Sequence, residues 1–157
     1  MNKYITLFAL ATLANIECDA QPNAAVPRLV VGITVDQLNS DDMEQFAALY
    51  GNGGFKKLLR EGVVYENAQY DFAPINLASA TTAIATGASP VDNGITAERW
   101  VSRETLRPVG CTFDKKFFVS PNNVKSSTIG DEMKMASNGN ALVFSVAANQ
   151  DAAVLQG

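Results

Sequence analysis

The stretch LVVGITV, residues 29–35, is a continuous run of apolar and small residues, and Asp36 follows it directly. Its β-branched side chains and its lack of polar alternation are typical of a strand buried on both faces of a parallel sheet. Open α/β sheets place their ligand sites at the carboxyl ends of such strands. Asp36 is therefore a candidate metal ligand, and the alternative is an aspartate that caps a helix or closes a turn.

The rest of the chain alternates between expected strands and expected helices. Two further strands are expected at residues 63–70 and 141–147. The expected helices lie at residues 40–50, with Ser40 or Asp41 as the N-cap, and at 55–61, 76–86 and 126–137. Ile129, Met133 and Met135 are expected to face inward on the last of these. This alternation predicts an α/β protein with a parallel sheet whose faces are covered.

Residues 95–107, which include the only tryptophan, Trp100, are expected to form an irregular excursion or a hairpin. The three expected strands are fewer than the roughly five or six of a usual sheet. We therefore interpret the chain as a truncated, N-terminal part of a larger α/β domain.

The first twenty residues have the pattern of a secretory signal peptide. Lys3 supplies a positive start, residues 4–16 are almost uninterruptedly apolar, and Ala20 precedes the expected cleavage point. The apolar run is shorter than the roughly 20 residues that span a bilayer, so no membrane span is expected. The alternative is a buried N-terminal helix. The prediction is an exported protein, periplasmic or secreted, in which residues 21–27 form a flexible lead-in.

The net charge of −4 gives no electrostatic reason to expect nucleic acid as a partner. The sequence contains no histidine, which is the residue on which most transition-metal and acid–base sites depend. After the expected cleavage Cys111 is the only cysteine, so no internal disulfide is expected.

The second candidate site is the start of the small-residue helix at residues 76–86. Small residues let an anionic substrate approach the backbone N–H groups at the positive end of the helix dipole. Ser79, Thr81 and Thr82 place hydroxyl groups near that start. The alternative is that small residues only permit tight packing of the helix on a sheet, since a hydroxyl without a base or a metal is inert.

Four segments occur in the order typical of the alkaline phosphatase superfamily: LVVGITVDQL at 29–38, YGNGGFKKLLREGVVYENA at 50–68, ATTAIATGASPVDNGI at 80–95 and SSTIGDEMK at 126–134. The chain most resembles the bacterial type I phosphodiesterase/nucleotide pyrophosphatase and phosphate-irrepressible phosphatase branch. The resemblance runs from Arg28 to the last residue. It implies a three-layer sandwich with a mostly parallel central sheet, of which residues 28–157 would be the N-terminal part.

The resemblance also implies a chemistry. Members of this superfamily hold a pair of zinc ions through aspartates and histidines and attack phosphorus with a metal-activated Thr or Ser. Asp36 matches the first zinc-ligating aspartate, and the remaining ligands of the family lie beyond residue 157. The implied substrate is a small phosphorylated molecule, either a phosphomonoester or a phosphodiester.

Several positions depart from the family pattern. The nucleophile position falls on Leu77, which has no nucleophilic atom, and a shift of two residues would make Ser79 the nucleophile. Thr81 stands where relatives carry a histidine, and Glu98 stands where the phosphomonoesterases carry an asparagine. Asn149 and Asp151 replace the lysine and arginine of a phosphate clamp, and an aspartate in place of an arginine repels phosphate.

Three functions follow as hypotheses. The first is an exported zinc-dependent phosphohydrolase with Asp36 as a metal ligand and Ser79 as the nucleophile. The second is a catalytically inactive member of the family that acts as an envelope or secreted binding protein. The third, outside this family, is a small secreted α/β binding module.

Overall fold

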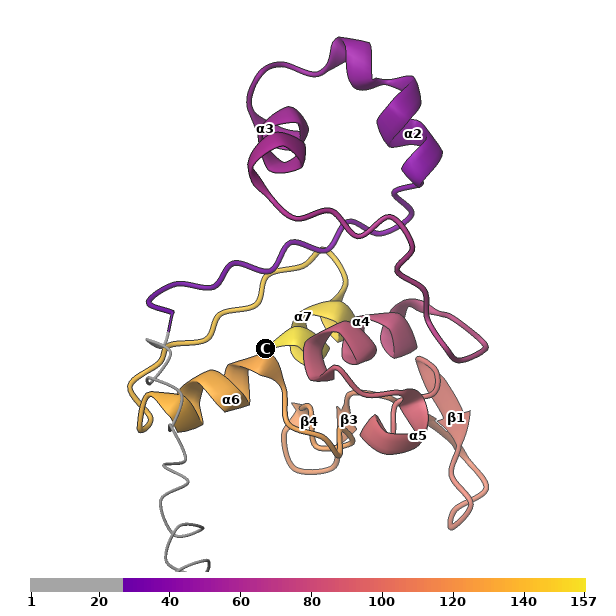
Figure 1. Cartoon of the computed structure of the whole chain (residues 1–157). Helices are drawn as coiled ribbons and strands as arrows, with labels where there is room; N and C mark the ends of the chain where they lie inside the picture. Colours follow the sequence, from indigo (N-terminus) through magenta and orange to yellow (C-terminus); the bar gives the residue numbers. More distant parts are fainter. Residues whose placement is uncertain (1–26) are drawn as a thin grey trace, which may run out of the picture. The chain divides into compact units, whose positions relative to one another are not determined.

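A computed structural model describes residues 27–157 (Figure 1). The predicted signal peptide, residues 1–20, and nearly all of the predicted lead-in, residues 21–27, lie outside the described residues. Val31–Gly157 form one compact unit. Within the described part of the chain, no helix is both long enough and apolar enough to cross a bilayer.

The unit contains mostly short helices joined by extended segments. In the first half these are α2 (Ser40–Gln45), the 3-10 helix η2 (Ala47–Leu49), α3 (Gly54–Glu61), α4 (Leu77–Thr86) and α5 (Pro90–Asn93). The second half adds α6 (Ile129–Ala136) and α7 (Gln150–Gln156). Between α5 and α6 lie four short strands: β1 (Arg99–Val101), β2 (Pro108–Gly110), β3 (Phe113–Asp114) and β4 (Phe118–Val119).

Helix α4 forms where the small-residue pattern predicts it, because both of its ends are capped. Asn76 and Ser79 form a capping box at its start. Gly87 closes its end in the left-handed conformation, at φ 65°, which a residue with a Cβ atom adopts only at a cost. The expected helix at residues 76–86 is thus confirmed, with its end as predicted and its first helical residue at Leu77.

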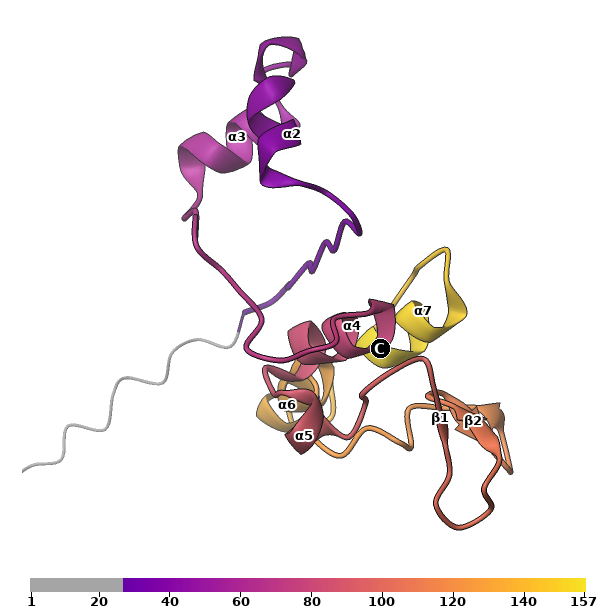
Figure 2. The same cartoon turned by 90° about the vertical axis from the view of Figure 1, so that its right-hand side faces the viewer.

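The core of the unit is small and gathers around α4. Four fully buried residues form it: Ala78 of α4, Leu155 of α7, and Ile95 and Cys111 from the chain between these helices. Trp100 and Val124 are partly buried against this cluster. Helices α4 and α7 lie side by side in both views (Figures 1 and 2). Segments that are far apart in the sequence therefore meet at one point.

The four strands form two antiparallel hairpins. In the first, β1 pairs with β2 in the register Arg99↔Gly110 and Trp100↔Val109 (Figure 2). Of the two alternatives predicted for residues 95–107, the structure has the hairpin, and it extends to Gly110. In the second, β3 pairs with β4, with Asp114 opposite Phe118. Since side chains alternate along a strand, Arg99 and Trp100 lie on opposite faces of the first hairpin.

The three segments predicted as strands of a parallel sheet, residues 29–35, 63–70 and 141–147, are not hydrogen-bonded strands in the described structure. Both sheets of the described residues are two-stranded and antiparallel. The physical reason is that a strand is defined by its partner, and no neighbouring ladder pairs with these extended segments. Their apolar side chains are largely exposed: Leu29 is 78% exposed, Ile33 79% and Phe144 85%.

Two further details differ from the sequence predictions. The N-cap of α2 is Asn39, whose side chain accepts a hydrogen bond from the backbone N–H of Asp41, rather than Ser40 or Asp41. On α6, Ile129 and Met135 are 53% and 61% exposed, so the inward face expected there is wrong for both residues. The apolar spacing of α6 is real, but few residues of the unit cover it.

Candidate functional site

A cavity of about 700 Å³ opens between the two hairpins and the start of α7. Its lining comes from segments that are separate in the sequence: Glu98, Arg99, Pro108, Gly110, Thr112, Phe113, Phe118, Val119, Asn149, Gln150 and Asp151. We call this the hairpin cavity. The structure brings together here Glu98, Asn149 and Asp151, which the sequence analysis predicted to be departures from the family's phosphate-contacting residues.

One hydrogen bond fixes Asp151 at the edge of this cavity. The hydroxyl of Thr112 donates to Asp151 Oδ1 at 2.5 Å, across 39 positions of sequence. Thr112 is itself buried, so this contact attaches α7 to the chain that leads from β2 to β3. The side chain of Asn149 already has a structural role, because its oxygen accepts a hydrogen bond from the backbone N–H of Ala152 at 3.1 Å and caps α7.

The charges of the hairpin cavity do not favour phosphate. Its lining carries the carboxylates of Glu98 and Asp151 and a single cation, Arg99. Burial, and then the negative charge of Asp151, raise the pKa of the neighbouring Cys111 thiol to about 11. Asn149 and Asp151, at the start of α7, therefore provide no pair of cations that could clamp a phosphoryl group.

The start of α4 lies close to the same hairpin. Asn76 Nδ2 donates to the carbonyl oxygen of Thr96 at 3.0 Å, two residues before Glu98. Leu77, the first residue of α4, is partly buried and contributes only carbon atoms. The described structure thus places Leu77, the residue predicted to occupy the nucleophile position, near the hairpin, and its side chain has no nucleophilic group.

Ser79 is fully buried and its hydroxyl already has partners. Its Oγ accepts the backbone N–H of Asn76 at 3.0 Å and can donate to the Asn76 carbonyl oxygen at 3.2 Å. Its own N–H donates to Asn76 Oδ1 at 3.0 Å. This geometry gives Ser79 a capping role in α4, and Ser79 does not line the hairpin cavity. Thr81, where the sequence analysis predicted a departure from a histidine of the family, is also buried.

Asp36 lies in an exposed turn at the end of the segment 29–35. Its neighbour Gln37 has a φ of 60°, in the left-handed region, and the two residues form the turn together. Among residues 27–157, no group of three or more His, Cys, Asp or Glu side chains is arranged to hold a metal ion. The described residues can offer Asp36 as one ligand, and they do not form a complete metal centre.

A family model described as type I phosphodiesterase / nucleotide pyrophosphatase matches residues 30–153. The chain therefore belongs to the type I phosphodiesterase/nucleotide pyrophosphatase family.

Among curated relatives, the chain is 37% identical over 143 residues to alkaline phosphatase PhoV of Synechococcus elongatus, covering 85% of this chain and 26% of that protein. It is 36% identical over 149 residues to alkaline phosphatase PafA of Elizabethkingia meningoseptica, covering 87% of this chain and 27% of that protein. The crystal structure of wild-type PafA superposes with a TM-score of 0.78 at 34% identity, over 84% of this chain and 28% of that one. The chain adopts an alkaline phosphatase-like fold and spans about a quarter of the length of these relatives.

Sequence reasoning found some residues of the hairpin cavity and missed others. Glu98, Asn149 and Asp151 were singled out by their positions in the family pattern. Thr112 was missed, because a lone threonine between two short strands gives no signal until its contact with Asp151 is known. Arg99 and Phe113 were missed too, and the register of the two hairpins is what brings them to the cavity.

Proposed function

We propose that the whole protein is an exported, metal-dependent phosphohydrolase that acts on small phosphate monoesters or diesters. The observation that carries this proposal is the superposition on alkaline phosphatase PafA, with a TM-score of 0.78 at 34% identity over 84% of the chain. The hairpin cavity and the start of α4 would form one wall of the substrate site.

A zinc ion would be held in part by Asp36. A single exposed carboxylate suits one ligand position of such an ion, whereas a catalytic zinc site takes three protein ligands. Residues 27–157 do not supply that set. When bound, zinc would polarise the phosphoryl oxygens of the substrate. The role of this part of the chain would be to shape the pocket and to orient the substrate.

A specific observation favours a second candidate function, a catalytically inactive member that binds a ligand without turnover. Leu77 has no nucleophilic atom at the family's nucleophile position, and the Ser79 hydroxyl is buried and bonded to Asn76. An enzyme of this family without an accessible hydroxyl cannot form a covalent intermediate on that residue.

The experiment that separates the two functions uses the complete open reading frame, purified and assayed for zinc content and for hydrolysis of aryl phosphate mono- and diesters. Zinc together with turnover would support the hydrolase. Absence of both would leave the binding function. Zinc without turnover, together with turnover gained by Leu77→Thr, would identify a binding protein that keeps the metal site.

Ser79 can be tested against a matched variant. Ser79→Ala and Asn76→Ala both break the capping box of α4, and each should lower the free energy of unfolding by about 1 kcal/mol. If Ser79 only caps the helix, the two variants should lose activity to a similar, small extent. Loss of turnover in Ser79→Ala alone, with similar melting temperatures for both, would instead make Ser79 the nucleophile.

A further inference from the structure

A second cavity lies on the opposite face of the first hairpin. It has a volume of about 1020 Å³, and Trp100 and Val109, the cross-strand pair next to Arg99↔Gly110, belong to its lining. Four cationic side chains surround it: Arg103, Lys115, Lys116 and Lys125. Two carboxylates, Glu104 and Asp114, are also present. We call this the basic cavity.

The lining has a net charge of +2, four cations against two carboxylates, and the Asp114 carboxylate is held in its loop by local donors. It accepts the backbone N–H groups of Lys116 at 2.6 Å and Phe117 at 2.8 Å, and the Ser120 hydroxyl at 3.0 Å. Asn122 Nδ2 donates to it as well. Glu104 is then the one carboxylate of the lining without such a set of donors among the described residues.

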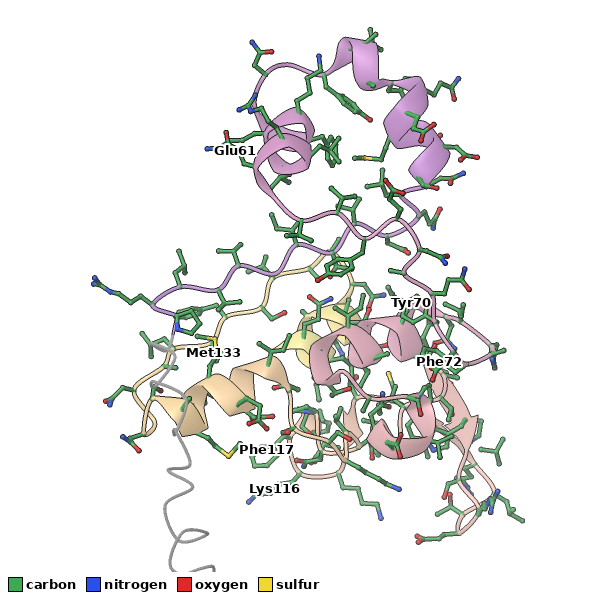
Figure 3. The ribbon with its side chains drawn as sticks, viewed as in Figure 1. Glu61, Tyr70, Phe72, Lys116, Phe117 and Met133 are labelled. Atoms are coloured by element: carbon green, nitrogen blue, oxygen red, sulfur yellow. The ribbon has the colours of Figure 1, made fainter. Side chains whose placement is uncertain are left out.

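Contacts hold two of the four cationic residues, Lys125 and Lys116, in place. The backbone N–H of Lys125 donates to the carbonyl oxygen of Asn93 at 2.9 Å. Its side-chain stem lies against Gly94, since a Cβ atom on Gly94 would be 3.2 Å from Lys125 Cδ. The ammonium group of Lys116 lies over the neighbouring aromatic ring, with Nζ 4.9 Å from the centroid of the Phe117 ring (Figure 3). Asn123 Nδ2 donates to the Cys111 carbonyl oxygen at 2.8 Å and attaches this loop to the core.

A concentration of cations in one concave region is unexpected in this chain. The net charge of the protein is −4, and it has 12 lysines and arginines in all, of which four line the basic cavity. Clefts lined by one sign of charge focus the electrostatic potential and raise the local concentration of the opposite ion. Arginine and lysine donors bind phosphoryl and carboxylate oxygens by charge-assisted hydrogen bonds.

We propose that the basic cavity binds a small anion with at least two negative charges, carried by phosphoryl or carboxylate groups. This site is separate from the hairpin cavity, with which it shares only Phe113. The proposal does not depend on turnover, and it applies equally to a hydrolase and to a binding protein.

The test uses pyrophosphate and citrate as the two probes, so that phosphoryl and carboxylate sources are distinguished. Trp100 lines the basic cavity and is the only tryptophan of the chain, so its fluorescence can report binding. We expect saturable binding of at least one probe, weakened as salt is added because ions screen the attraction. Calorimetric titration of the same samples gives the affinity if the change in fluorescence is small.

Variants assign the binding to this cavity. Replacing both Lys115 and Lys125 by alanine should weaken binding by about tenfold or more, since two charge-assisted contacts are removed. Glu104→Gln should tighten it. The matched control is Lys57→Ala, which removes an exposed lysine paired with Glu61 on α3 and should change nothing.

Two results would overturn the proposal. One is the absence of saturable binding of either probe by fluorescence and by calorimetry. The other is an equal affinity in the double lysine variant and in the Lys57→Ala control, both folded by circular dichroism. Failure of the proposed hydrolase function would appear separately, as a lack of turnover with anion binding intact.

Discussion

The Asp114 carboxylate shows how much a single side chain can organise. It lies at the end of β3 and accepts hydrogen bonds from the backbone N–H groups of Phe117 and Lys116, which turn the chain toward β4. These bonds favour the charged form and lower the pKa of Asp114 from 3.8 to about 2. The carboxylate therefore helps to hold the loop together while it remains partly exposed to solvent.

This leads to a prediction about acid stability. A folded-state pKa below the unfolded value gives stability that is present above pH 3.8 and is lost as the pH falls toward about 2. Asp114→Asn should remove this part of the acid dependence, so the melting temperature of the variant should fall less than that of the parent between pH 4 and pH 2. The measurement is thermal unfolding followed by circular dichroism across that range.

Asp41→Asn, on the exposed α2, is the control for this comparison, and its melting curve should follow that of the parent protein. If Asp114→Asn and the parent lose the same amount of stability between pH 4 and pH 2, the hydrogen bonds to the Asp114 carboxylate do not contribute as described.

At the scale of single residues, the sequence identified positions better than roles. Ser79 was recognisable as a hydroxyl near the start of a helix, which fits both a nucleophile and a cap. Its bonds to Asn76, three residues earlier, describe a local cap, whereas its burial depends on how the chain around Pro74 and Thr96 folds back on α4. Such a packing contact has no local sequence signature.

Among the elements, the helix ends were the most predictable feature. Gly87 is a residue type whose capping chemistry is local, so the sequence alone predicts the end of α4, and its start was predicted to within one residue. The segments 29–35 and 141–147 are the opposite case. Apolar runs indicate that a segment can form a strand, but pairing requires a neighbour that the sequence of the segment does not describe.

The C-cap of α4 gives a prediction at this scale. Gly87→Ala places a Cβ atom on a residue at φ 65° and should lower the free energy of unfolding by about 1 kcal/mol. Gly53→Ala is a matched control, because Gly53 has a φ of −87° and no atom lies within 4 Å of the added Cβ. Urea denaturation of both variants checks this. An equal midpoint for the two variants would contradict the role assigned to Gly87.

For the whole molecule, the most prominent feature is apolar surface. The segment 141–147 alternates between half-buried and exposed side chains, and its exposed members are Leu142 at 82%, Phe144 at 85% and Val146 at 96%. The half-buried side chains on the other face pack inside the unit. Val143, for example, lies so close to α6 that a Cβ atom on Gly130 would be 3.0 Å from its Cγ1. One face therefore packs inside the unit and the other presents an apolar stripe to solvent.

We predict that this stripe causes the 157-residue chain to associate in solution. A contiguous apolar patch on an extended segment promotes self-association. Replacing Leu142, Phe144 and Val146 together by threonine should raise the monomeric fraction in analytical ultracentrifugation at least about twofold. The control replaces three exposed but scattered residues, Leu49, Val63 and Leu106, and should have little effect. Equal monomeric fractions in the two triple variants would sink this prediction.

Family membership was the part of the whole-molecule description that the sequence predicted best. The four ordered segments indicated the same family that the match to a family model over residues 30–153 establishes. The hairpin cavity could not be predicted in the same way, because Thr112 and Asp151 meet only after α7 folds against α4. Ordered motifs identify a lineage, whereas a cavity depends on the packing of elements that are distant in the chain.

The burial of Cys111 makes the junction at the centre of the unit accessible to kinetic measurement. The thiol is fully buried beside Ala78 of α4 and Leu155 of α7, and its raised pKa keeps it protonated at neutral pH. With Cys18 replaced by serine, a thiol-specific reagent can modify the protein only when these helices separate. The rate of labelling in the native protein then reports how often that junction opens. Slower labelling in the presence of a ligand would show that the ligand holds the helices together.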